Sequence, residues 1–481
     1  MPDQPTPAAD LAYLPAAEAI RSFRNGELSP VELMEAVIAR AEIVEPSVNA
    51  FADSAFERAL ENAREAEARY RGRGPEPRPL EGIPVAVKEE APIEGDPWTL
   101  GSLVYRDQVA DNTAVFVQRI IDAGGIVHAR TKTPEFSCAP FTHSRLWGVT
   151  RNPWNRECSP GGSSGGSGAA LAAGSTTLAT GSDIGGSIRI PASFCGVVGF
   201  KPPYGRVPEM EVFNLDHYCH EGPLARTVGD CALLENVIAG PHPSDVASLR
   251  PKLEIPDDFV GIQGWRIALS ENLGCFEVDQ DVARNTRETA DALRDAGAVV
   301  EEVALPWTLD EITHAARIHF GMIFGAWVAD IYAEHRDELT AYARQFAEEA
   351  MAVPKEAFVE GLAVEAKIYA PLGQLLEDFD ALVCPTVAVA ALEAGEDYVD
   401  VGPTVNGRRL DSWYEVLMTI PFNIASRCPV LAVPSGFSTS GVPTGLSIVG
   451  RTYDDVSVFR VGAALERARP WLDTSERRPR L

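Results

Sequence analysis

Residues 159–168 read SPGGSSGGSG, and residues 181–189 read GSDIGGSIR. A run of glycine and serine is usually a flexible linker. The flanks of the first run argue against that interpretation, because NPWN at 152–155 precedes it and the helix-forming AALAA at 169–173 follows it. Glycines let a backbone approach a ligand closely, and consecutive N–H groups in such a turn form an anion-binding concavity. The two blocks therefore predict a structured site that can stabilise the oxyanion of acyl transfer.

Further motifs surround these two blocks along the chain. Upstream lies GIPVAVK at 82–88, whose apolar run fits a buried strand that ends at Lys88. Together these motifs resemble the amidase signature family, and the resemblance covers about residues 15–470. The other matching segments are 152–155, 161–166, 183–191, 195–202, 205–208, 222–227, 380–386 and 421–423.

The resemblance implies a role for each matching residue. Ser187 matches the nucleophile of the family, Ser163 matches the bridging serine that usually follows a cis peptide bond, and Lys88 matches the base. The separation of the two serines, 187 − 163 = 24, also agrees with the family pattern. Asp183 and Arg189 are expected to hold the nucleophile loop by hydrogen bonds rather than to react. The implied oxyanion hole consists of the backbone N–H groups of Ile184, Gly185, Gly186 and Ser187.

A lysine can act as the base for a serine only when it is neutral. A serine hydroxyl is a poor nucleophile without a base, and burial beside the apolar residues 85–87 would favour the neutral amine. Glu89 and Glu90 would oppose that effect, although strand alternation would point Glu89 to the face opposite Lys88. We expect a relay in which the lysine takes a proton from the bridging serine, and the bridging serine takes one from the nucleophile. Three nearby serines are expected to be structural: Ser164, Ser167 and Ser182.

The rest of the chain alternates strand-like and helix-like segments. Alternation of this kind predicts an α/β fold with a large mixed β-sheet core covered on both faces by helices. The family resemblance implies about eleven strands in that sheet. We divide the chain into an N-terminal helical arm at 1–74 and a catalytic core at 75–481, with a helical insertion at about 305–375. Apolar runs that read as strands lie at 83–87, 126–129, 299–305, 381–384, 430–433 and 446–449.

The composition argues against several other classes of protein. Lysine and arginine number 42 against 69 aspartates and glutamates, and the resulting net charge of −27 disfavours binding to nucleic acid. No apolar run reaches the roughly 18 residues of a membrane span, and no segment resembles a signal peptide. Eight scattered cysteines without a C-x-x-C pair fit a reduced, cytoplasmic protein. We expect neither a metal nor a cofactor, because the histidines lack metal-ligand spacing and His217 with His220 is too weak a pair.

Three other functions fit parts of the sequence. GGSSG at 161–165 matches the G-x-S-x-G motif of α/β-hydrolases, but residues 156–160 read as a loop where that motif requires a strand. The amidotransferase subunit that supplies ammonia for tRNA-bound glutamate shares the signature, yet residues 411–414 and 421–423 look more like stand-alone amidases. A non-catalytic binding protein on the same fold would not need all three catalytic positions intact, as they are here.

The expected partner is a small-molecule amide substrate. The number of aromatic residues favours an aryl or bulky acyl amide over a small polar one, although core packing explains any one of them more often than substrate contact. The family also cleaves some esters and carbamates, so these are candidate side activities. Many relatives are homodimers through their N-terminal helices, so the resemblance also implies a homodimer. The aromatic residues considered are Phe141, Phe213, Tyr218, Phe320, Trp327 and Trp413.

Overall fold

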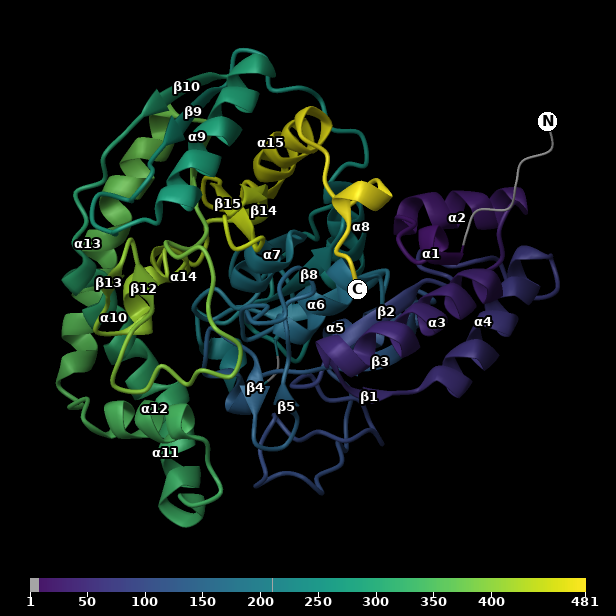
Figure 1. Ribbon diagram of the computed structural model, residues 1–481, viewed down its shortest axis with the longest axis horizontal. Coiled ribbons are helices and arrows are strands. Elements are labelled where there is room, and N and C mark those ends of the chain that lie inside the picture. The colour runs from purple at the N-terminus through teal and green to yellow at the C-terminus, as the bar shows by residue number, and fades with distance from the viewer. Residues whose placement is uncertain (1–7, 210) are drawn as a thin grey trace.

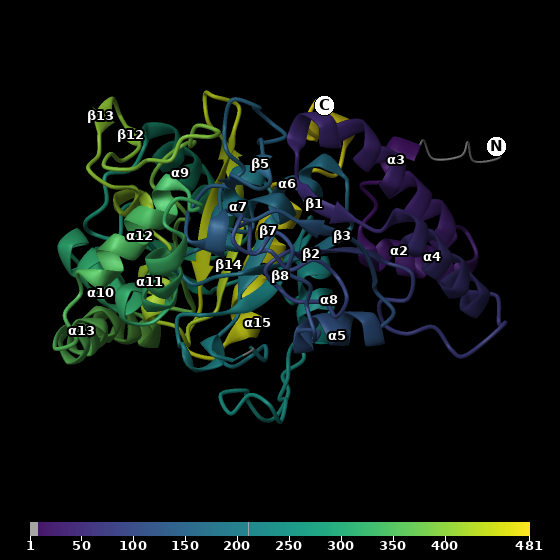
Figure 2. The same ribbon diagram turned by 90° about the horizontal axis from the view of Figure 1, so that it is seen from below.

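The computed structural model describes residues 8–209 and 211–481, so residues 1–7 of the predicted arm lie outside the described part. Its centre is an 11-stranded sheet with the strand order β1-β3-β2-β6-β8-β7-β14-β15-β11-β9-β10 (Figures 1 and 2). β2 pairs in parallel with β3 and β6, whereas β14 pairs antiparallel with β7 and β15. The predicted large mixed sheet of about eleven strands is therefore confirmed.

The strands of this sheet are short, and two separate hairpins lie outside it. The sheet contains β1 Phe51–Ser54, β2 Pro84–Lys88, β3 Ile126–Thr131, β6 Leu178–Ser182, β7 Val198–Lys201, β8 Glu221–Ala225, β9 Arg266–Leu269, β10 Val299–Glu302, β11 Ala381–Pro385, β14 Val430–Phe437 and β15 Pro443–Val449. The hairpins are β4 His143–Ser144 with β5 Gly148–Val149, and β12 Thr404–Val405 with β13 Arg408–Arg409.

Helices cover both faces of the sheet, as predicted. Side chains alternate across β2: Val85 and Val87 join the core that includes Phe116 of α5, whereas Ala86 joins the core that includes the alanines of α6. Lys88 is two residues beyond Ala86, so the same alternation places its side chain on the face of the sheet that α6 covers. The helices are α1 Ala8–Leu11, α2 Ala16–Asn25, α3 Pro30–Val48, α4 Phe56–Tyr70, α5 Val115–Asp122, α6 Gly165–Ala173, α7 Arg189–Cys195, α8 Val228–Ile238, α9 Gln280–Asp295, α10 Leu309–Met322, α11 Phe324–His335, α12 Ala341–Met351, α13 Ala357–Asp378, α14 Pro421–Ile424 and α15 Asp455–Ala468.

Four consecutive helices, α10 to α13, pack together on the left of Figure 1. Leu372 and Leu376 of α13 belong to the same apolar core as Leu382 and Cys384 of β11. These helices therefore lie against the part of the sheet near β11, next to the β9–β10 end. They fill most of the segment predicted as a helical insertion, although its description as an insertion stays a prediction.

The described part of the N-terminal arm predicted as helical at 1–74 is not wholly helical, because it contains β1. β1 pairs antiparallel with β3 at the edge of the sheet, with Phe51 opposite Thr131. Phe51 is buried, but a strand of four residues is too short to show a clear alternation in the sequence. Because β1 ties this segment to the sheet, the domain boundary at residue 74 also stays a prediction.

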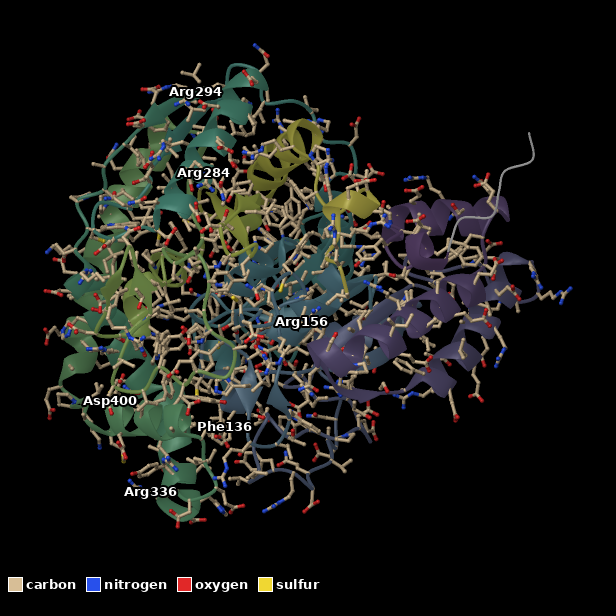
Figure 3. All side chains as sticks on the ribbon, viewed as in Figure 1. Phe136, Arg156, Arg284, Arg294, Arg336 and Asp400 are labelled. Atoms are coloured by element: carbon tan, nitrogen blue, oxygen red, sulfur yellow. The ribbon has the colours of Figure 1, made fainter. Side chains whose placement is uncertain are left out.

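Charged side chains lie over the surface of the molecule. Arg294, Arg336 and Asp400 stand at its outer margin in Figure 3, and all three are exposed. Each of the eight cysteines is a free thiol. Among the described helices, none combines the length and the apolar character that a membrane crossing requires.

Candidate active site

The first glycine- and serine-rich block forms a buried turn that leads into the N-terminus of α6. Ser163 is fully buried, and the Gly162–Ser163 peptide bond is cis. A Cβ atom on Gly162 would lie 2.4 Å from the carbonyl oxygen of Phe141, and one on Gly166 would lie 2.4 Å from the backbone nitrogen of Lys132. The block is glycine-rich because neighbouring backbone passes too close for any side chain.

Lys88 reaches this turn from the end of β2. Its Nζ atom donates hydrogen bonds to Ser163 Oγ at 2.7 Å and to Ser182 Oγ at 2.9 Å. Ser182 ends β6, and β6 is a parallel neighbour of β2, so their carboxyl ends meet at one edge. The structure thus brings Lys88 and Ser163 together. The sequence treated Ser182 as structural and gave no indication that it contacts the lysine.

A carboxylate completes the surroundings of the lysine. Glu90 Oε1 lies 2.8 Å from Lys88 Nζ, and Glu90 Oε2 accepts a hydrogen bond from Ser137. Glu89 is oriented differently: its Oε1 accepts hydrogen bonds from the backbone and the hydroxyl of Thr99. Burial raises the pKa of Glu89, although the bonds from Thr99 act against that rise. The sequence placed Glu90 beside Lys88 but did not predict their ion pair, because strand alternation no longer holds beyond the end of β2.

Ser187 lies in the second glycine-rich block, on the loop between β6 and α7. Its carbonyl oxygen accepts a hydrogen bond from Ser164 N at 3.2 Å, which joins the two blocks. Within residues 8–209 and 211–481, no hydrogen bond joins Ser163 Oγ to Ser187 Oγ. The structure therefore forms the lysine contact of the predicted relay and places its two serines on adjoining loops.

The predicted oxyanion hole is only partly free. Gly186 N donates to Asp183 Oδ1 at 2.8 Å, so this N–H group is already engaged. Across the described residues, no protein atom accepts a hydrogen bond from the backbone N–H groups of Ile184, Gly185 and Ser187. Three of the four predicted donors are thus available to an incoming oxygen. The sequence could not reveal that the fourth donor closes a turn with the neighbouring aspartate.

A buried ion pair between Asp183 and Arg189 lies behind the loop, and its role in holding the loop stays a prediction. Arg189 donates to both carboxylate oxygens of Asp183, at 2.8 and 2.9 Å, and neither side chain is exposed to solvent. Burial disfavours the charged carboxylate, yet the Arg189 guanidinium and the Asn423 amide hold the pKa of Asp183 well below its usual range. These contacts favour the ionised carboxylate of Asp183, which also accepts hydrogen bonds from Gly186 N and Ile188 N of the loop.

Thr419, just before α14, and Asn423, within α14, contact the same loop, which the sequence did not predict. Thr419 Oγ1 donates to the carbonyl oxygen of Gly185 at 2.6 Å, and Asn423 Nδ2 donates to Asp183 Oδ1 at 2.9 Å. A Cβ atom on Gly186, whose φ is 127°, would lie 2.3 Å from Thr419 Oγ1. These partners lie more than 200 residues away along the chain, and only the motif at 421–423 pointed to them.

Two cavities adjoin at the loop. A cavity of about 40 Å³ is lined by Ser187, Phe320, Phe324, Phe346 and Trp413 together with other mostly apolar residues. A larger cavity of about 310 Å³ is lined by Ser163, Ser182, Glu90, Phe136, Phe213 and Trp327 among others. Ser137, Ile184 and Phe324 line both cavities. Four of the six aromatic residues considered from the sequence thus border a cavity, whereas Phe141 and Tyr218 border neither.

The two histidines weighed as a metal pair do not converge. His220 contacts the carbonyl oxygens of Asp183 and Ser426, at 3.0 and 3.1 Å, and so belongs to the support of the nucleophile loop. Burial lowers its pKa to about 3, so the imidazole is neutral there. His217 instead contacts Glu365 at 3.2 Å.

Known proteins resemble this chain along nearly its whole length. A family model described as Amidase matches residues 32–459. The chain is 34% identical to an acylamidase of Rhodococcus erythropolis, over 96% of this chain and 97% of that protein. It is 33% identical to a glutamyl-tRNA(Gln) amidotransferase subunit of Chloroflexus aggregans, over 96% and 98%. The solved structure of a bacterial aryl acylamidase of the amidase signature enzymes superposes with a TM-score of 0.89 at 30% identity, over 96% of this chain and 97% of that chain.

Proposed function

This chain belongs to the amidase family and is an amide-hydrolysing enzyme, and we propose that it cleaves the C–N bond of an aryl or bulky acyl amide through Ser187. The observation that carries this proposal is the hydrogen bond of 2.7 Å between buried Lys88 and Ser163, on the turn that adjoins the Ser187 loop. A buried lysine that contacts a serine is a base in the position the reaction needs.

In the proposed mechanism, neutral Lys88 accepts the proton of Ser163 while Ser163 accepts that of Ser187. Ser187 Oγ then attacks the amide carbonyl carbon and forms the tetrahedral intermediate. Three backbone N–H groups, those of Ile184, Gly185 and Ser187, are placed to stabilise its oxyanion. The proton returns through Ser163 to the amine as the C–N bond breaks. Water then attacks the acyl-enzyme and releases the carboxylic acid.

The two cavities suggest where each half of the substrate lies. Ser163 gives the proton to the leaving amine, so the amine lies on the side of the larger cavity that Ser163 lines. The acyl group then occupies the smaller, mostly apolar cavity beside Ser187, against Phe320 and Phe346. An aromatic amine suits the larger cavity, where Phe136 and Trp327 offer ring faces and edges.

The main alternative is a glutamine amidotransferase subunit in tRNA-dependent amidation, which the similarity to the Chloroflexus aggregans protein favours. The net charge of −27 and the apolar lining beside Ser187 argue for the stand-alone amidase instead. Ester or carbamate cleavage would use the same relay as a side activity. A cytoplasmic location, which the eight free thiols support, and a homodimer through the N-terminal helices complete the proposal.

The test is hydrolysis of an aryl anilide, a p-nitrophenyl ester and an aryl carbamate by the wild type, Ser187→Ala and Ser193→Ala. Ser193 is a buried serine of α7 outside the site, so its variant controls for the loss of a hydroxyl. Anilide turnover by the wild type and the control, absent from Ser187→Ala, is the expected result. Equal turnover by all three proteins would exclude Ser187 as the nucleophile. Glutamine hydrolysis that appears only with added partner subunits would favour the amidotransferase.

A further inference from the structure

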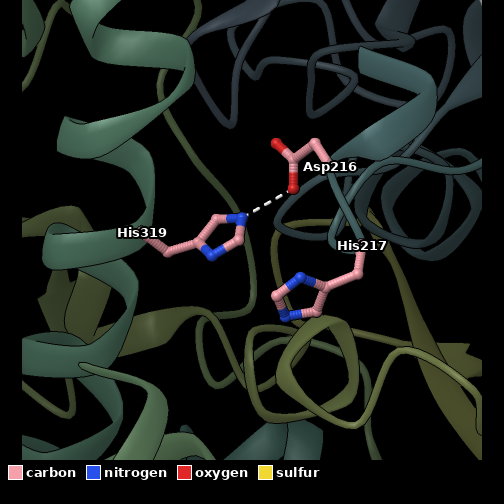
Figure 4. A group of neighbouring side chains, drawn as sticks. All are labelled: Asp216, His217 and His319. Carbon is pink, nitrogen blue, oxygen red and sulfur yellow. Dashed lines mark hydrogen bonds and ion pairs between the residues drawn. The ribbon is translucent and has the colours of Figure 1, made fainter. Parts of the chain in front are cut away.

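A cluster of imidazole and carboxylate groups lies behind the nucleophile loop and takes no part in the proposed reaction. Asp216 and His217 precede β8, and His319 comes from α10. Each offers one ligand atom, and these atoms all lie within 4.8 Å of one another. His319 Nε2 is 2.6 Å from Asp216 Oδ1. Figure 4 shows one ring nitrogen of His217 facing this pair.

Glu365 of α13 orients both imidazole rings from the opposite side. Its Oε2 lies 3.2 Å from His217 Nε2, and its Oε1 lies 3.4 Å from His319 Nδ1. Tyr218 also donates its hydroxyl hydrogen to Oε1, at 2.9 Å, and fixes the carboxylate. In the structure His319 Nε2 donates a hydrogen bond to Asp216 Oδ1, and a bound metal ion would take the place of that hydrogen between the two atoms. A carboxylate behind each imidazole is the usual arrangement around metal-ligating histidines.

We propose that Asp216, His217 and His319 bind a divalent transition-metal ion of the zinc type. Two imidazole nitrogens and one carboxylate oxygen are donors that Zn²⁺ accepts, and water can complete a tetrahedral site. The negative charges of Asp216 and Glu365 balance that of the dication. Asp216 and His319 are buried, whereas the side chain of His217 is 26% exposed and gives the ion a route from solvent.

The position of the site indicates a structural role. His319 neighbours Phe320, which lines the smaller cavity, and Asn423 Nδ2 donates both to the carbonyl oxygen of Tyr218 and to Asp183. A metal here joins the segment before β8 to α10 and α13, and it fixes the wall of the acyl cavity. Asp216 and His319 are 103 residues apart in the sequence, which is why no local spacing revealed the site.

The experiment uses the full-length protein without a histidine tag, freed of metal by a chelator. Zn²⁺ is added in a calorimeter, and Co²⁺ is added while visible absorption is recorded. The expected result is one ion bound per chain, Co²⁺ bands typical of tetrahedral coordination, and a higher unfolding temperature with Zn²⁺. His319→Gln and Asp216→Asn should each weaken binding at least about 100-fold, and Glu365→Gln about 10- to 100-fold.

The matched control is His314→Gln, which alters an exposed histidine of the same helix that contacts Glu360. It should bind the ion as the wild type does. Circular dichroism checks that each variant is folded. The Asn and Gln replacements are close in size to the side chains that they replace. Absence of a stoichiometric site in the wild type, or unchanged affinity in His319→Gln, would overturn the proposal. The cluster would then be an ion-pair network that a protonated His319 balances.

Discussion

Glu90 and Lys88 form an ion pair within the proposed proton relay, with Oε1 2.8 Å from Nζ. Ser163 and Ser182 provide two further acceptors to the same nitrogen. Three acceptors match the three N–H donors of an ammonium group. The arrangement therefore gives Lys88 Nζ three acceptor partners, whereas the proposed chemistry requires this nitrogen to accept a proton.

Replacing Glu90 with Gln should move the rising part of the pH–activity profile to lower pH. An opposite charge close to an amine stabilises its protonated form in general, so removing this carboxylate should move the profile in that direction. The measurement is kcat/KM of anilide hydrolysis between pH 5 and pH 10. Glu94→Gln, which alters an exposed glutamate nearby, should leave the profile in place. An unchanged profile in Glu90→Gln would show that the ion pair does not control the base.

Lys88 and Ser163 should act as one unit. Lys88→Met and Ser163→Ala should each lower kcat by about 10²- to 10⁴-fold. The double variant should have about the same kcat as the less active of the two single variants, because either change already breaks the relay. Ser182→Ala removes only one acceptor of the lysine and should cost about tenfold. Losses that multiply in the double variant would mean that the two residues act separately.

Removing Arg189 should destabilise the protein and impair catalysis together. Arg189→Met leaves the fully buried carboxylate of Asp183 without its cationic partner, a change that costs about 3–5 kcal/mol at neutral pH. The pKa of Asp183 is lowered in the folded protein. The ion pair therefore stabilises the wild type at every pH above the ordinary pKa of aspartate, and this stabilisation is lost only as the pH falls into strong acid. The stability gap between the two proteins, measured by urea unfolding, should therefore narrow at acid pH. A gap that is constant with pH would contradict this account.

The acyl and amine cavities should respond to different substitutions. Phe346→Val enlarges the smaller cavity and should raise the preference for bulky over small acyl groups by about tenfold or more in kcat/KM. Trp327→Leu alters the larger cavity and should change the preference among leaving amines instead. A series of anilides that varies one half at a time measures both effects. If both variants respond to the same half of the substrate, the assignment of the cavities is wrong.

Glu466 should make stability depend on pH outside the active site. Its carboxylate accepts hydrogen bonds from Val228 N at the start of α8, at 3.2 and 3.3 Å. Burial, with a further contribution from Asp230, raises its pKa to about 7 against the opposing hydrogen bonds. The resulting stability is complete below about pH 4.5 and is lost as the pH rises through about 7. Compared with Glu466→Gln, the wild type should therefore lose up to about 3 kcal/mol between pH 5 and pH 8.5 in urea unfolding. Parallel pH profiles of the two proteins would contradict this assignment.

The sequence predicted the fold class well because the relevant patterns are local. The apolar runs and the glycine-rich turns depend on residues close together in the chain, so the α/β class with a mixed sheet followed from them. The number of strands and the grouping of Lys88 with Ser163 came from the resemblance to the amidase signature family. The roles of these residues stay predictions. The contacts of Thr419 and Asn423 with the nucleophile loop join segments more than 200 residues apart, and no local pattern encodes them. The ion pair of Glu90 depends on the chain direction after a strand ends, which alternation does not specify.

The crowding around Gly162 and Gly166 has a consequence for how this enzyme can change over many generations. Almost any substitution at either glycine would place an atom too close to neighbouring backbone. We therefore expect few substitutions at these two positions during evolution. Phe320 and Phe346 stand on separate helices, where a change of size leaves the turn intact. The residues that line the smaller cavity can therefore change on α10 and α12 while the turn that holds Ser163 stays unaltered.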